Sequence, residues 1–288
     1  MILKVKILLL NIFATIIILA TFSNSANAAG ISVDAGLTPP EDRWILRTQV
    51  RYRERRNDPS DMNREMNTYI FPVVLAYGLR PDLTLLIRQR VINQKMSVRG
   101  TTERDEGLGD LFVLAKYRAY RLNTPDYTLG IAPTIGLEFP TGHDSFTSET
   151  WDLKPGLFLS GRRGPWAVDL NIAYKWNGFA DRGKGGRDPG DEVSLDLAFA
   201  HQLSIGQKGY ASLAPVLEMT YKHIWADQLK GHDMSNTGET FMYISPGIKF
   251  ITSSLILEAL VQIPVWQHQK GSQLEQDVGI LAGVRFMF

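Results

Sequence analysis

The chain of 288 residues has no cysteine, and beyond Phe22 it has no long apolar run. In an exported protein the absence of cysteine excludes disulfides, so stability must come from backbone pairing and packing. Charged residues make up 21% of the chain and interrupt every later segment before the ~18 apolar residues of a transmembrane helix. The 31 basic and 30 acidic residues are balanced, which gives no support to nucleic-acid binding. A helical membrane protein is therefore excluded, and the length fits one large all-β domain.

The N-terminus carries the three parts of a secretory signal peptide. Lys4 and Lys6 form a basic region, an apolar run covers residues 7–22, and Ala26-Asn27-Ala28 is a small-x-small cleavage site. The alternative is a membrane anchor helix, but a run of about 16 residues is shorter than the ~20 that span a bilayer. We therefore expect residues 1–28 to be a signal peptide that is cleaved near Ala28, so that the mature chain begins near Ala29.

The C-terminal segment alternates with a period of two residues. Ile280, Val284, Phe286 and Phe288 share one face, whereas Arg285 lies on the other. Only a β-strand puts every second side chain on the same side. A chain that ends flush with such a strand resembles the C-terminal strand of bacterial outer-membrane β-barrels, and the resemblance implies that Phe286 and Phe288 belong to an assembly signal. One face of the strand then meets lipid and the other a polar lumen.

The same alternation recurs along the whole mature chain. It predicts twelve strands, at residues 44–53, 69–77, 83–93, 109–121, 127–139, 151–161, 166–176, 192–199, 210–225, 242–250, 255–265 and 277–288. Short turns, such as residues 78–82, alternate with polar loops about twice as long, such as residues 93–107. We therefore predict an all-β, transmembrane antiparallel β-barrel over residues 44–288, with both termini on the periplasmic side. The alternative, a water-soluble β-sandwich, explains the strands but not the alternation in loop length.

Parity assigns the side chains of these strands to the two faces of the wall. Aromatic residues at the ends of the outward faces are expected at the membrane interfaces: Trp44, Tyr52, Tyr69, Tyr77, Tyr127, Phe139, Trp166 and Trp176. Charged residues that point inward are expected to line the lumen: Arg47, Arg51, Arg88, Arg90, Asp110, Lys116, Arg118, Asp152, Lys154, Asp169, Lys175, Asp196, Glu218, Lys222, Glu258 and Arg285. The basic cluster among them is expected to attract anions or the anionic end of an amphipathic solute. Alternatively, charges of both signs simply pair across strands in a hydrated lumen.

Two features fall outside regular alternation. Residues 29–43 precede the first strand without periodicity, and the stretch 30–42 is either a plug that enters the barrel from below or a disordered periplasmic leader. Six prolines fall inside predicted strands, where proline removes a ladder donor: Pro72, Pro133, Pro155, Pro215, Pro246 and Pro264. These prolines indicate either local bulges or wall kinks that open lateral gaps towards the bilayer.

The sequence offers few groups suited to catalysis or metal binding. Its five histidines include no His-x-x-x-His pair, and neither a Gly-x-Ser-x-Gly motif nor a Gly-rich phosphate loop is present. The enzyme alternative, a phospholipase-like outer-membrane barrel, needs a serine beside a histidine on the outer wall. His201 and Ser160 are candidates for that pair, but no motif supports them. We therefore predict a protein that is not an enzyme and has no cofactor, no catalytic residue and no metal site.

Short motifs resemble one outer-membrane family. Gly107-Leu108-Gly109-Asp110-Leu111 leading into residues 115–118, Phe139-Pro140-Thr141-Gly142, and Tyr77-Gly78-Leu79 before a turn are similar to a transporter-like family labelled for the meta-pathway of phenol degradation. The resemblance implies a barrel for the passage of small, often aromatic or hydrophobic compounds, and carries over no binding residues. We therefore predict an outer-membrane channel for passive diffusion of small organic compounds. Its expected partners are outer-membrane lipid, the barrel-assembly machinery and small organic solutes, with no nucleic acid. A closed structural or adhesive barrel is a further alternative.

Overall fold

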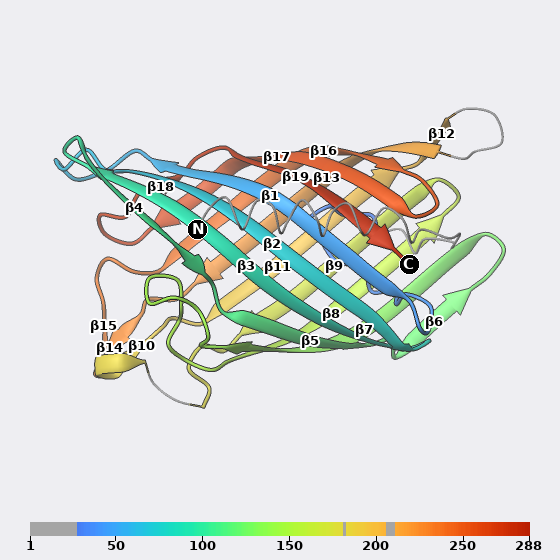
Figure 1. Ribbon diagram of the computed structural model, residues 1–288, viewed down its shortest axis with the longest axis horizontal. Coiled ribbons are helices and arrows are strands. Elements are labelled where there is room, and N and C mark those ends of the chain that lie inside the picture. The colour runs from blue at the N-terminus through green and yellow to red at the C-terminus, as the bar shows by residue number, and fades with distance from the viewer. Residues whose placement is uncertain (1–27, 181–182, 206–210) are drawn as a thin grey trace, which may run out of the picture.

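The computed structural model describes residues 28–180, 183–205 and 211–288, so the predicted signal peptide lies outside the described residues except for Ala28. Long antiparallel strands run obliquely around one axis and close on themselves (Figure 1). The ring closes where β1 (Trp44–Arg56) pairs with β19 (Gly279–Met287). The Trp44 N–H donates to the Phe288 carbonyl over 2.8 Å, which joins the first strand to the last residue. The predicted antiparallel barrel is confirmed.

Twelve strands form the wall, as predicted. Nine of them are single elements: β1, β2 (Glu65–Arg80), β3 (Leu83–Val98), β7 (Tyr127–Phe139), β8 (Asp152–Arg163), β9 (Trp166–Lys175), β13 (Ala211–Ile224), β16 (Glu239–Ile251) and β17 (Leu255–Gln269). The fourth strand is interrupted and consists of β4 (Thr101–Leu108), β5 (Leu111–Tyr117) and β6 (Tyr120–Asn123). The other two are β11 (Glu192–His201), continued by β12 (Leu203–Ile205), and β19, which β18 (Glu275–Gln276) precedes. A small separate sheet of β10 (Arg187–Asp188), β14 (Gln228–Leu229) and β15 (His232–Asp233) lies in two of the long loops.

The two faces of the wall differ in polarity, as β9 shows. Ile172 on its outer face is 44% exposed, whereas Asp169 on its inner face is 0% exposed. Because an exposed apolar row of this kind runs along every long strand, the outer face is the lipid-contacting surface of a transmembrane barrel. None of the helical segments in the described part of the chain has the length and apolarity of a membrane span.

Aromatic rings mark the two ends of the apolar band on the β1–β2 hairpin. Trp44 and Tyr77 lie together at the end of the short turns, with ring centroids 4.4 Å apart. Tyr52 and Tyr69 lie together towards the long loops, with centroids 5.1 Å apart. Rings at these heights sit where the headgroups of a bilayer meet its hydrocarbon.

One predicted outer loop is instead a hairpin that extends the wall. Residues 93–107 were expected to form a loop, but β3 continues to Val98 and pairs with β4 as far as Thr101. The two turn residues, Arg99 and Gly100, both have positive φ (51° and 84°), as in the tight turns that match strand twist. The loop prediction was wrong because a strand that projects beyond the membrane buries no apolar face, so residues 101–107 carry no apolar alternation.

Two of the prolines within strands perturb the wall only locally, as the alternative of local bulges predicts. At Pro264 the register of β16 against β17 shifts between Met242 and Tyr243, which is a bulge. At Pro72 the pairing of β1 with β2 is interrupted between Thr48–Val73 and Arg51–Ile70, but the register is unchanged on both sides. At these two positions proline therefore perturbs the ladder only locally, as a bulge at Pro264 and as missing rungs at Pro72.

Candidate solute pathway

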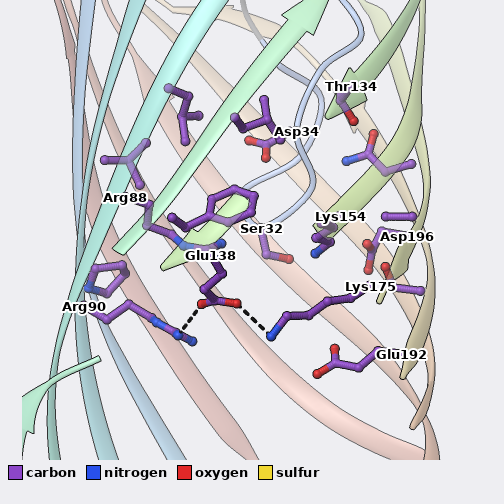
Figure 2. A pocket seen from close by; sticks show the side chains of 18 of the residues that line it. Ser32, Asp34, Arg88, Arg90, Thr134, Glu138, Lys154, Lys175, Glu192 and Asp196 are labelled. Carbon is purple, nitrogen blue, oxygen red and sulfur yellow. Dashed lines mark hydrogen bonds and ion pairs between the residues drawn. The ribbon is translucent and has the colours of Figure 1, made fainter. Parts of the chain in front are cut away.

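A cavity of about 320 Å³ occupies the lumen on the side of the long loops. Figure 2 shows its side chains converging from strands on opposite sides of the barrel. Eight of the predicted lumen residues line it: Arg47, Arg51, Arg88, Arg90, Lys154, Lys175, Asp196 and Lys222. Ser32 and Asp34, from the segment that precedes β1, form part of its floor.

A chain of ion pairs crosses this cavity. The Glu138 carboxylate lies between Arg90 and Lys175, with N–O distances of 2.7 and 2.8 Å (Figure 2). Lys175 also contacts Asp152 over 2.8 Å. A carboxylate held by two cations stays ionised and fixes both side chains against the wall. These residues therefore shape the pathway rather than leave free charge within it.

Other cations in the cavity have no acidic partner. Eight basic side chains but only four acidic ones line it. Arg51 donates to the Gln49 side-chain oxygen over 2.6 Å, and the Arg88 guanidinium lies 4.3 Å from the centre of the Phe112 ring. Within the described ranges no carboxylate lies within 4 Å of Arg51, Arg88 or Lys154. The excess positive charge makes this part of the lumen attractive to anions.

Next to these cations the cavity wall is apolar. Leu86, Phe112, Leu114 and Phe158 point into the lumen from β3, β5 and β8, and all four line the cavity. Phe112, Leu114, Phe158 and Ala132 pack into one buried cluster, with Leu86 against it. The predicted lumen set omitted this apolar side because it was chosen by charge, although parity places Phe112 on the same face as Asp110 and Lys116. The cavity thus has a cationic side and an apolar side.

The half of the lumen nearer the short turns is filled by the segment before β1, which lies inside the ring of strands (Figure 1). Glu218, on β13, accepts hydrogen bonds from the backbone N–H groups of Ile31 and Ser32. Lys116, on β5, donates to the carbonyls of Ala35 and Leu37 over 2.9 and 2.7 Å. Predicted lumen charges therefore bind the backbone of the chain's own N-terminal segment here.

Two wall glycines make room for this segment. A Cβ at Gly78 would lie 2.1 Å from the Pro40 carbonyl oxygen, and a Cβ at Gly130 would lie 2.7 Å from a Leu37 methyl group. A side chain at Gly78 would displace the backbone of the segment, because real Cβ contacts do not come so close, whereas one at Gly130 would force the Leu37 side chain to move. The wall and the segment therefore fit each other closely. A second cavity of about 90 Å³, lined by Ala35, Leu37 and Pro39, lies against this segment.

Most remaining residues of the predicted lumen set are held in local networks. Glu258 accepts from Arg47 and Gln49 over 2.9 and 2.7 Å and also contacts Arg285 at 3.1 Å. Asp110 accepts from the backbone N–H groups of Gly142 and Ser148, and so draws the loop after β7 inward. Arg118 follows the end of β5 near the short turns and is half-buried there.

The serine and histidine considered for an enzyme have different surroundings. Ser160 lies in the lumen, where its hydroxyl donates to Asp169 over 2.5 Å. The His201 ring packs edge-on against Trp166, with centroids 4.3 Å apart, at the end of the barrel. Among the described residues there is no group of three or more His, Cys, Asp or Glu side chains that could hold a metal ion.

One family of proteins matches the sequence of this barrel. A family model described as "Putative MetA-pathway of phenol degradation" matches residues 68–267. The chain belongs to this family. The match runs from β2 to β17, so it covers most of the wall and includes Arg88 and Phe112 of the cavity, but not Arg51 on β1.

Several solved structures are similar to this chain at low sequence identity. An outer membrane channel from Pseudomonas putida F1 is similar with a TM-score of 0.68 and 17% identity, over 89% of this chain and 100% of that one. The NanC porin gives a TM-score of 0.49 at 12% identity, over 84% of this chain and 98% of the porin. The KdgM porin, solved with a disordered oligogalacturonate, gives 0.43 at 11% identity, over 85% of this chain and 99% of the porin. No curated protein sequence matches this chain.

Proposed function

We propose that this protein is an outer-membrane channel for the passive diffusion of small organic compounds, and that it favours anions with an apolar or aromatic body. The observation that carries the proposal is the cavity in which Arg51 and Arg88 have no acidic partner and face Leu86, Phe112 and Phe158. The family match and the fold shared with an outer membrane channel support the broader part of this proposal.

Each side of the cavity contributes one part of the selectivity. The unpaired guanidinium groups attract a carboxylate or phenolate and offer it bidentate hydrogen bonds. The phenylalanine rings remove the apolar body of the solute from water, at about 25 cal/mol for each Å² buried. A channel must also release its solute, so this binding is expected to be weak. No nucleotide, metal or other cofactor has a role in this diffusion.

In this proposal residues 30–42 act as the plug and limit the flux. They occupy the half of the lumen through which a solute must leave towards the periplasm. Their bonds to Glu218 and Lys116 hold them in place, so passage requires these bonds to loosen. The remaining proposed partners are outer-membrane lipid at the apolar band and the barrel-assembly machinery at Phe286 and Phe288.

Liposome swelling tests the proposal. Liposomes that contain the refolded mature barrel are diluted into isotonic benzoate, benzylamine or arabinose, and the rate of swelling is measured by light scattering. We expect benzoate to enter faster than benzylamine, and the difference to fall when Arg51 and Arg88 are both replaced by serine. Equal rates for the two aromatic solutes would contradict the proposed selectivity. A sealed barrel with no flux of any solute would contradict transport and favour a closed structural or adhesive barrel.

A further inference from the structure

The segment before β1 begins at a buried position on the inner wall. Ala29 is 0% exposed, and its backbone nitrogen lies 2.5 Å from the Asp169 carboxylate, which is also 0% exposed. Lys249, on β16, donates to the carbonyls of Ala28 and Ala29 over 2.5 and 2.7 Å. A buried carboxylate and a buried ammonium group thus meet the backbone at the two residues that flank the expected cleavage site.

We propose that Ala29 is the first residue of the mature chain and that Asp169 is the docking site for the α-ammonium group that cleavage creates. Two independent observations coincide in this assignment. The small-x-small motif Ala26-Asn27-Ala28 places the cleaved bond after Ala28. The nitrogen that this cleavage frees is the atom that the structure places against Asp169.

The chemistry of processing changes the site in a defined way. Water hydrolyses the peptide bond between Ala28 and Ala29, so the Ala28 carboxylate leaves with the signal peptide. The Ala29 amine keeps its hydrogen, gains one more from the water, and takes up a proton at neutral pH. A neutral amide that donates to the Asp169 carboxylate becomes a charged donor, so the hydrogen bond becomes an ion pair. Lys249 loses its bond to Ala28 and keeps the one to Ala29.

The surrounding side chains suit a cationic group. Asp169 is oriented by Ser160 and by Arg162, which contact its other oxygen over 2.5 and 2.8 Å. Glu218 is 1% exposed, binds the backbone at Ile31 and Ser32, and has no Lys or Arg within 4 Å among the residues that the structure describes. The new positive charge therefore enters beside two buried carboxylates, Asp169 and Glu218, whose negative charges offset it.

This docking site sets the position of the whole segment. The Gly36 N–H donates to the Ser160 hydroxyl, which itself donates to Asp169, so the segment meets the same network a second time. Fixing the first residue fixes which residue meets Glu218, Lys116 and the wall glycines. The inference rests on the proposed function only in so far as the segment is a plug. The docking itself is independent of solute flux.

Two measurements on the barrel purified from outer membranes test the docking. Intact-mass spectrometry is expected to show a chain that begins at Ala29. The α-amine is then labelled with a pyridinecarboxaldehyde reagent, which is specific for N-termini. We expect the folded wild-type barrel to resist labelling and the guanidinium-unfolded chain to react fully. Asp169→Asn is expected to react while folded, whereas the matched control Asp110→Asn, which removes a buried carboxylate that binds the loop after β7 and not the segment, stays protected.

A second variant keeps the test decisive if Asp169→Asn does not fold. Insertion of Gly-Ser directly after Ala28 leaves the wall intact and moves the new α-amine away from Asp169, so its folded form is expected to label readily. A mature chain that starts at another residue would overturn the proposal. So would an α-amine that reacts as fast in the folded wild-type barrel as in the insertion variant. If the labelling pattern holds but liposomes show no flux, the docking stands and the channel function fails.

Discussion

The two halves of the lumen have the same construction but different contents. Near the short turns, inward charges bind the backbone of the N-terminal segment, as Glu218 and Lys116 do. Near the long loops, Arg51 and Arg88 face a cavity of about 320 Å³ without an acidic partner. Strand alternation alone delivers a polar inner face in both halves. Whether that face becomes a structural network or a solute site depends on whether a carboxylate or a peptide group reaches each cation.

The largest loss of stability is expected at Glu258, in the half of the lumen near the short turns that the N-terminal segment fills. Glu258→Gln removes the negative charge that pairs with Arg47 and Arg285, and all three groups are buried or nearly so. Breaking a buried network of this kind costs about 3–5 kcal/mol of unfolding free energy. Urea unfolding in lipid vesicles, followed by tryptophan fluorescence, measures the loss.

The matched control is Glu192, in the half of the lumen near the long loops that contains the cavity. Glu192→Gln breaks one ion pair with Lys222 whose side chains are partly exposed, and is expected to cost less than about 1 kcal/mol. Equal losses for the two variants would show that the two halves do not differ in burial as described.

The next largest loss of stability is expected from a charge placed on the outer face of the wall. Ile172 lies on β9, between Trp166 at the start of the strand and Trp176 just after its end, and is 44% exposed to the surroundings of the barrel. Ile172→Arg places a charge in hydrocarbon and is expected to cost about 2–4 kcal/mol of unfolding free energy. The same vesicle assay measures it. Thr102→Arg, on the hairpin that projects beyond the membrane, serves as the control and is expected to leave stability unchanged. No loss at Ile172 would mean that this face does not contact lipid.

A moderate effect is expected on ion selectivity. Replacing Arg88 by serine removes one unpaired cation from the cavity, so the anion preference falls while the barrel stays folded. The reversal potential in a planar bilayer under a potassium chloride gradient reports this change. The control Arg80→Ser removes an exposed cation near a short turn, and its reversal potential is expected to match the wild type. A larger shift at Arg80 than at Arg88 would move the selective region out of the cavity.

The smallest effect lies outside both halves, in the loop after β1. Hydrogen bonds from the Arg64 guanidinium and backbone hold the pKa of Asp58 below its usual value. Because the pKa of Asp58 is lowered, the stability that these hydrogen bonds give the loop is fully present above about pH 4. It is lost progressively as the pH falls below that value towards the lowered pKa. Hydrogen exchange at the Arg64 amide, taken relative to its intrinsic rate at each pH, is expected to quicken over that range. Asp58→Asn is expected to quicken it at neutral pH, whereas Asp61→Asn in the same loop leaves it unchanged.

The sequence predicts the wall well because lipid and lumen impose a strict period of two. That pattern places Asp169 inside and Ile172 outside on one strand, and it predicts all twelve strands. It does not predict the hairpin at residues 93–107, because strands outside the membrane have no apolar face. Nor does it distinguish paired cations such as Arg90 from unpaired ones such as Arg88. Pairing depends on register between strands far apart in the chain, and the position of residues 30–42 depends on glycines that carry no charge signal.

Single-channel conductance, recorded with and without residues 30–42, tests the central claim most directly. Migration on gels before and after heating verifies that both barrels are folded. We predict that the deleted form conducts several times more current than the full mature chain and admits larger solutes, while its anion preference persists because Arg51 and Arg88 remain. Equal conductance in the two folded barrels would contradict the account, because the segment would then not lie across the path of the solute.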